Sequence, residues 1–168
     1  MPIIDLGGLR IPAAEVLELH LVRSEKRLCG VTVVQGSTAL QLQAFHALPD
    51  RNWDVIRGEL SAKITRGGGS AKDCAGPAGV EIRASVPTIR PGGSMTVMQV
   101  RFLGQDGPGW LLRGVVTGAG AAPESTDQWA YRLFTSSVVV PSFSPPENGS
   151  AIALNIPDGF HGQHGDRS

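Results

Sequence analysis

The side chains with the richest chemistry lie in residues 100–114, where two arginines flank a glycine-rich turn. Arg101 and Arg113 fall in adjacent predicted strands. Asp106 lies in the turn between them, and Trp110 follows it directly. Guanidinium groups bind carboxylate or phosphate, and tryptophan is a common apolar anchor at binding surfaces. One interpretation is therefore a small recognition surface made of these four side chains.

The same residues also have a structural interpretation, to which we give more weight. Asp106 would cap its own loop, and Trp110 would fill the core. The two arginines would pair with acids elsewhere in the fold, such as Glu81 or Asp54. Both interpretations stay open at the level of sequence.

The familiar catalytic and nucleotide-binding motifs are missing from the sequence. There is no phosphate-binding P-loop, no Gly-x-Ser-x-Gly turn and no His-Glu-x-x-His helix. The triglycine 67–69 follows a predicted helix, so its amides cannot be presented to a phosphate at a helix start. His161 and His164 have a spacing that could bind a metal loosely, but a solvated tail explains them better. We expect no catalytic residue, no metal site and no cofactor.

An enzyme hypothesis would depend on His46. This residue ends a predicted strand on the same side as Leu40 and Leu42, where a hydrogen-bonded boundary role is the usual one. Histidine beside a carboxylate can act as a general base. The alternative function is therefore a small hydrolase or nucleotide-handling enzyme that uses His46 with Asp106 or Asp54.

Composition limits the partners. The 168 residues include 15 Lys and Arg and 15 Asp and Glu, so the formal net charge is zero. General binding to nucleic acid or anionic membranes needs excess positive charge, and we do not expect it. A second alternative is an accessory role on nucleic acid through a local arginine patch. No apolar run approaches the ~20 residues of a membrane span.

Cysteine usage predicts an intracellular location, and the start of the chain shows no secretory signal. The two cysteines, Cys29 and Cys74, lie among apolar or small residues, and a secreted disulfide scaffold would carry more of them. Residues 1–5 show no basic start followed by an apolar stretch, so no secretory signal is visible.

Hydrophobic alternation predicts an antiparallel sheet. Three consecutive segments with an apolar residue at every second position form a meander: residues 16–22, 28–34 and 39–46. Three further strands are predicted later, at residues 80–86, 95–103 and 110–117, with the last two joined by a loop over 104–109.

Two segments show helical periodicity. The first runs from Trp53 to Ile64, can be capped by Asp50 or Asn52, and ends at the triglycine. The second begins with a Ser-x-x-Gln capping box at residues 125–128. Residues 138–140 either finish this helix or form a short edge strand.

Strands and helices do not alternate as they do in a parallel βαβ fold. We therefore predict an α+β fold, in which an antiparallel sheet of about six to seven strands carries two main helices on one face. Residues 1–140 would form this single domain. Residues 141–168 would form a largely disordered tail rich in proline, glycine and serine, in which the apolar segment 151–154 could act as a latch.

Several short motifs occur in an order that is more specific than any one of them alone. They are residues 5–12 (DLGGLRIP), 40–45 (LQLQAF), 53–57 (WDVIR), 76–83 (GPAGVEIR), 100–102 (VRF) and 106–114 (DGPGWLLRG). In this order they resemble an actinobacterial family catalogued as domain of unknown function 3710, over residues 4–140. The resemblance implies a cytoplasmic protein without an assigned reaction. The last helix also resembles the close of the PsbP-type α+β fold, which suits a binding or assembly role.

The function that fits the sequence best is a non-catalytic binding or assembly module, because no coherent set of nucleophile, base and oxyanion donor is visible. We expect a protein partner or self-association. The residues expected to carry binding are Arg101, Asp106, Trp110 and Arg113.

Overall fold

The computed structural model describes residues 2–16, 18–25, 27–47, 50–125, 128–143 and 151–156. Several predictions fall on residues outside these ranges and stay untested: the place of Leu17 in its strand, the middle of the capping box, the two tail histidines and most of the C-terminal tail.

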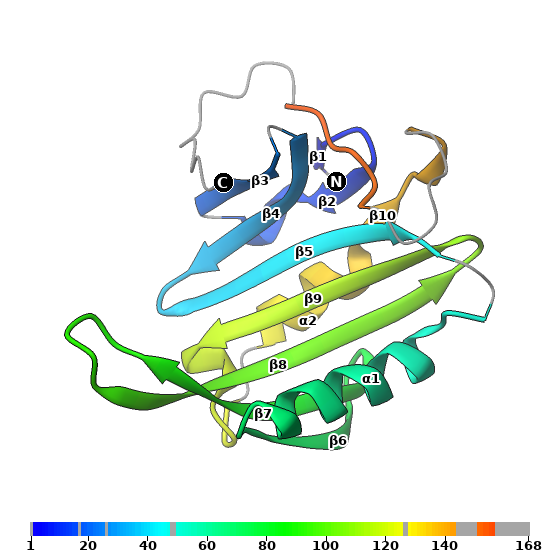
Figure 1. The fold of residues 1–168 in the computed structure, drawn as a ribbon. Helices are drawn as coiled ribbons and strands as arrows, with labels where there is room; N and C mark the ends of the chain where they lie inside the picture. Colours follow the sequence, from blue (N-terminus) through cyan, green and yellow to red (C-terminus); the bar gives the residue numbers. More distant parts are fainter. Residues whose placement is uncertain are drawn as a thin grey trace.

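Seven antiparallel strands form the main sheet. They are β3 (Glu18–Ser24), β4 (Arg27–Gln35), β5 (Thr38–His46), β6 (Ser70–Gly76), β7 (Gly79–Ile89), β8 (Met95–Gly107) and β9 (Trp110–Gly118). Their order in the sheet is β3-β4-β5-β9-β8-β7-β6 (Figure 1). Two meanders, β3–β5 and β6–β9, therefore meet where β5 pairs with β9 along its whole length.

The strand boundaries differ from the prediction at two places. Hydrophobic alternation misses β6, because its residues are small or polar and only its backbone pairing with β7 makes it a strand. The predicted loop 104–109 is mostly strand, since β8 continues to Gly107 and β9 begins at Trp110. Gly109 makes the tight turn possible, with a φ of 73° that glycine adopts most readily.

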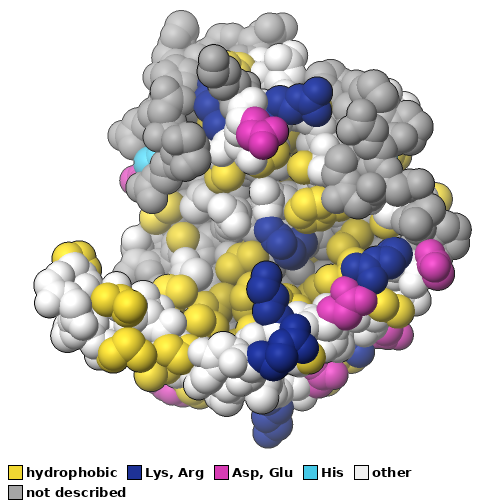
Figure 2. All heavy atoms as spheres, viewed as in Figure 1, with side chains coloured by type: hydrophobic (Ala, Val, Ile, Leu, Met, Phe, Trp, Pro, Cys, Tyr) yellow, Lys and Arg dark blue, Asp and Glu magenta, His cyan; other side chains and the backbone are white. Residues whose placement is uncertain are grey.

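Helix α1 (Trp53–Arg66) covers β6, β7 and β8 on the face turned to the viewer in Figures 1 and 2. Asn52 is its N-cap, as one of the two predicted alternatives, and accepts a hydrogen bond from the Val55 N–H at 3.0 Å. Gly67 is its C-cap, as the triglycine predicts. Trp53 is buried under the helix, and its Nε1 donates to the Val80 carbonyl at 2.7 Å.

Helix α2 (Gln128–Ser136) lies behind the sheet, on the other face (Figure 1). There it packs with a small second sheet of order β1-β2-β10, formed by β1 (Ile3–Asp5), β2 (Leu9–Pro12) and β10 (Val138–Val139). The short strand β10 agrees with one of the two outcomes predicted for 138–140. Short 3-10 helices complete the order at Ala13–Glu15, Ala119–Ala121 and Pro141–Phe143.

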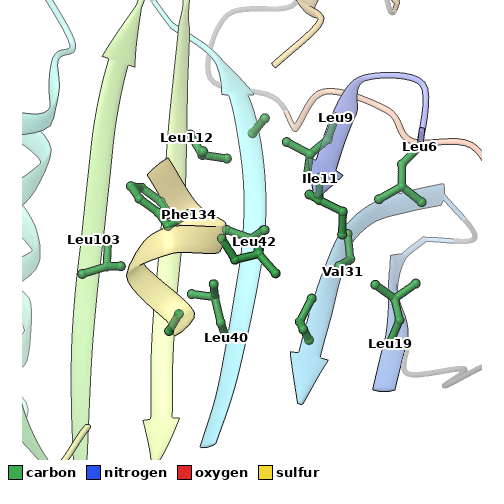
Figure 3. Packing of buried hydrophobic residues seen from close by; sticks show 14 of the residues in the cluster. Leu6, Leu9, Ile11, Leu19, Val31, Leu40, Leu42, Leu103, Leu112 and Phe134 are labelled. Atoms are coloured by element: carbon green, nitrogen blue, oxygen red, sulfur yellow. The ribbon is translucent and has the colours of Figure 1, made fainter. Parts of the chain in front are cut away.

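The main core lies between the main sheet, α2 and the small sheet (Figure 3). It is built from inward residues of successive strands that oppose one another, such as Val33, Leu40 and Val116. Residues 151–156 join this core: Ile152 and Leu154 are buried, and their N–H groups donate to the carbonyls of Ala44 and Leu28 at 2.8 and 3.0 Å. Residues 151–156 are therefore hydrogen-bonded to the backbones of β4 and β5.

The prediction of a mostly antiparallel sheet with two helices is confirmed, but the prediction that both helices pack on one face is wrong. Adjacent residues of a strand point to opposite faces. Leu103 belongs to the core under α2, while the backbone of the next residue, Gly104, faces the Trp53 ring of α1. Apolar residues at even positions of β7 and β8, such as Ile82 and Val100, provide α1 with its own buried patch.

We expect Gly104→Ala to destabilise the fold. A Cβ at this position would collide with the Trp53 ring, and overpacking of this kind costs about 2 kcal/mol. Urea unfolding followed by tryptophan fluorescence measures the loss. The matched control is Gly58→Ala in α1, where a Cβ meets nothing and removal of a helical glycine should stabilise by about 0.5–1 kcal/mol. Equal effects of the two substitutions would contradict the docking of Trp53 on β8.

Candidate functional site

Arg101 belongs to a buried polar network between the sheet and α2. The residue is 2% exposed, and its Nη1 donates to the Tyr131 hydroxyl at 3.0 Å while Nη2 donates to the Ala122 carbonyl at 2.5 Å. The Tyr131 hydroxyl donates in turn to the carboxylate of Glu81, with oxygen distances of 2.8 and 2.9 Å. Glu81 is also buried and forms an ion pair with Arg83 at 3.0 Å.

This network connects three elements that are distant in sequence. Glu81 and Arg101 come from β7 and β8, and Tyr131 comes from the first half of α2. Gly76 on the neighbouring strand leaves the space that Glu81 occupies, because a Cβ there would collide with its carboxylate. Buried charges are tolerated when they are paired and hydrogen-bonded in this way. The network therefore accounts for Arg101 as a structural residue that ties α2 to the sheet.

The network changes the ionisation of its members. Burial raises the pKa of Tyr131, and the nearby Glu81 carboxylate adds to the rise, while the hydrogen bond from Arg101 opposes it. The hydrogen bond to Glu81 raises the pKa of Arg83. At neutral pH the tyrosine stays protonated and can donate to Glu81.

Asp106 and Trp110 also have structural contacts. Asp106 accepts a hydrogen bond from the backbone N–H of Trp53 at 2.8 Å, so it caps the start of α1 instead of its own loop. Trp110 is half-buried, packs against the main core, and has its ring against Gly107. The hairpin between β8 and β9 thus holds the first turn of α1 in place.

Arg113 lies on the α1 face of the sheet and is only partly buried. Its Nη2 donates to Oε1 of Gln43, and its guanidinium lies over the ring of Phe45 at 5.1 Å from the centroid. Its Nε is buried without a hydrogen-bond partner, and no described carboxylate pairs with it. Burial lowers the pKa of Arg113, and the Coulombic effect of Cys29 acts in the opposite direction.

The four predicted binding residues therefore do not form one surface. Arg101 is paired across the sheet with Val116, whereas Arg113 is paired with Gly104, so the two guanidinium groups leave the sheet on opposite faces. Arg101 and Arg113 each have a buried Nε without a partner, but both Nη atoms of Arg101 donate within the fold, whereas no described residue accepts from Nη1 of Arg113. The binding role of these residues stays a prediction, and the structure separates its members.

The sheet also separates the groups of the enzyme alternative. His46 is buried and continues the inward series of Leu42 and Ala44, on the side of α2. Asp106 contacts α1 on the other side, and Asp54 in α1 pairs with Arg57. The geometry therefore does not provide the dyad of His46 with Asp106 or Asp54.

Other sites for chemistry are sparse in the described ranges. No group of three or more His, Cys, Asp or Glu side chains there could hold a metal ion. Cys29 and Cys74 are free, and His20 pairs with Glu18 on strand β3. Among the helices that the structure describes, none is long and apolar enough to cross a membrane.

The hairpin of β7 and β8 extends beyond the rest of the sheet (Figure 1, the green hairpin at the left). Strand β6 pairs with β7 only as far as Ser85, and β9 pairs with β8 only from Val100. Within residues 86–99 the two strands therefore pair only with each other. We call residues 86–99 the β7–β8 ribbon.

The β7–β8 ribbon carries large apolar side chains in water. Ile89 and Met95 are each 69% exposed, Val97 is 60% exposed and Met98 is 40% exposed. Hydrophobic alternation predicts strands over 80–86 and 95–103, but it does not say where a neighbouring strand ends, so it does not predict that these side chains are exposed. The available signal was the turn Arg90-Pro91-Gly92-Gly93 between two apolar runs, which predicts a hairpin but not its isolation.

The pKa of Tyr131 gives a direct test of the buried network. The chain contains one tyrosine, so tyrosinate absorbance in the near ultraviolet reports this residue alone. We expect a titration midpoint above that of the chain unfolded in urea. Because the folded state holds the proton more tightly, this contribution to stability is present below the unfolded pKa and is lost as pH rises through the folded pKa. Circular dichroism at each pH controls for unfolding, and a midpoint at or below the unfolded value would rule out the network.

Substitution of the two arginines should have different effects on stability. Arg101→Met leaves the buried Glu81 carboxylate with less compensation, and we expect a loss of about 3 kcal/mol in the free energy of unfolding. Arg113→Met removes a partly buried charge that lacks a carboxylate partner, so no loss is expected. Urea unfolding of both variants compares them. A loss for Arg113→Met that matches the loss for Arg101→Met would show that both arginines are structural.

Of the three comparisons with known proteins, one found a match. The searches of curated proteins and of solved structures found no match. A family model described as "Protein of unknown function (DUF3710)" matches residues 1–163, almost the whole chain. This match confirms the resemblance that the order of short motifs predicts, and the chain belongs to the DUF3710 family.

Proposed function

We propose that this chain is a non-catalytic protein-binding module whose contact element is the β7–β8 ribbon. The observation that carries the proposal is the exposure of Ile89, Met95, Val97 and Met98 on a pair of strands that no other strand supports. A two-stranded hairpin is marginally stable alone in water, and exposed apolar clusters mark interaction surfaces. A partner that covers the ribbon would bury these side chains.

The charge of the β7–β8 ribbon favours an apolar partner surface. Residues 86–99 contain one basic residue, Arg90, and no acid. Arg90 donates to the Thr96 hydroxyl at 3.0 Å within the ribbon, and its single charge is the only one the ribbon offers for ionic recognition. Another protein or a second copy of the chain fits this composition. We place the protein in the cytoplasm, which suits its free cysteines.

The test is a ribbon variant with Ile89, Met95 and Val97 all changed to threonine. Threonine keeps the preference for strands and removes most of the apolar surface. We expect loss of self-association in sedimentation, or loss of the partners that co-purify with the unchanged chain, without a change in thermal midpoint.

The matched control is Ile3→Thr in β1, because Ile3 is 61% exposed but lies outside the ribbon. This control should keep every association. A folded ribbon variant that keeps them too would remove the β7–β8 ribbon as the contact element.

A further inference from the structure

Arg113 lies at the centre of a surface that α1 leaves open. Inward and outward residues alternate along β5 and β9, and the outward set opposite α2 includes Gln43 and Phe45 on β5 with Arg113 and Val115 on β9. Phe102 on β8 is paired with Val115 and extends this set toward α1. Figure 2, which views this face, shows a hollow beside α1 with apolar and basic side chains along it.

The hydrogen bonds of Arg113 leave most of its donors unused. A guanidinium group has five N–H donors. One nitrogen, Nη2, bonds to Gln43, while Nε has no partner and no described residue accepts from Nη1. Gln43 is itself held by its amide, which donates to the Cys29 sulfur at 3.7 Å. The side chain is therefore fixed in position, and Nη1 keeps donors that no described residue uses, whereas the unpartnered Nε is buried.

No described carboxylate forms an ion pair with Arg113. Asp106 accepts a hydrogen bond from the Trp53 N–H at the start of α1, and Glu59 pairs with Arg51 at 2.6 Å. Arg57 forms an ion pair with Asp73 on β6, so the side of α1 that carries Arg57 faces the β6 edge of the sheet. Helical periodicity places Lys63 on the opposite flank, toward β9, and no described carboxylate pairs with it.

The sheet residues that surround the guanidinium are mostly apolar. Phe45, Phe102 and Val115 are each half-buried, so each leaves part of its apolar surface open beside Arg113. A ligand with an anionic end and a small apolar body would contact both kinds of surface. A carboxylate suits a planar guanidinium, which can donate two parallel hydrogen bonds to it.

We propose that the hollow beside α1 binds a small organic carboxylate with an apolar body, held by Arg113 between Gln43 and Phe45, with Lys63 on the rim. This site is separate from the β7–β8 ribbon and does not depend on it. In this proposal Arg113 binds the ligand, and Arg101 is a structural residue.

The test uses three probes: phenylacetate, its neutral isostere phenylacetamide, and inorganic phosphate. Titrations followed by calorimetry and by amide and arginine Nε chemical shifts measure affinity and place the probe. We expect phenylacetate to bind, with the largest shifts at Arg113 and Gln43. Phenylacetamide should bind at least about tenfold more weakly, because it loses a charge-assisted hydrogen bond. Phosphate should also bind about tenfold more weakly, because it has no apolar body to contact Phe45, Phe102 and Val115. No binding of phenylacetate, equal binding of the amide, or equal binding of phosphate would each overturn the proposal.

Variants assign the contact. Arg113→Gln should weaken phenylacetate by about tenfold or more, and Lys63→Gln by about two- to fivefold, as for an exposed ion pair. Arg90→Gln in the ribbon is the matched control and should leave the affinity unchanged. Because Lys63 is exposed, its variant tests the site even if Arg113→Gln fails to fold. Unchanged affinity for phenylacetate in both the Arg113 and the Lys63 variants would refute the site. The threonine variant of the β7–β8 ribbon should still bind phenylacetate, so the carboxylate site and the protein-binding proposal are tested independently.

Discussion

Two aromatic rings pack against opposite faces of the main sheet where β8 pairs with β9. The placement of both helices depends on these two ring–backbone contacts. Gly104 and Gly114 are diagonal neighbours in that pairing. The Trp53 ring of α1 lies on the first, and the Phe134 ring of α2 lies on the second. A side chain at either position would push one helix away from the sheet. Successive side chains of β8 and β9 point to opposite faces of the sheet, and this alternation decides which helix covers which face. Residues on different faces therefore cannot contact one another.

That separation explains why two similar arginines have different roles. Arg101 points toward α2, where Tyr131 and Glu81 complete a hydrogen-bonded network in the interior. Arg113 points to the other face, where Gln43 and Phe45 hold it but no described acid compensates its charge. A fold optimised only for stability would replace such a side chain with an apolar one. The structural interpretation of the sequence therefore suits Arg101, and the functional interpretation is the one that we propose for Arg113.

Local patterns predicted most of the strands and helix ends. Alternation located β4 and β5, and Asn52 and the triglycine located the ends of α1, because these signals arise from contacts within a few residues. The errors concern contacts between distant segments. Nothing in the sequence near Asp106 says that it caps a helix that starts at Trp53, and nothing near Tyr131 identifies Glu81 as its acceptor. Register decides the face of each arginine, and register depends on the whole sheet.

The β7–β8 ribbon shows the same limit in another form. An apolar alternating strand is a core strand only if neighbours cover it, and coverage depends on how long β6 and β9 are. The apolar cross-strand pairs of β7 and β8 continue into the ribbon, where no third strand pairs with them. Examples are Ile89 with Met95 and Pro87 with Val97. Selection for solubility acts against such exposure, since isolated apolar strands promote association. The proposed partner that covers the β7–β8 ribbon would explain why this exposed surface is kept. The sheet also places His46 and Asp106, the candidate catalytic pair, on opposite faces.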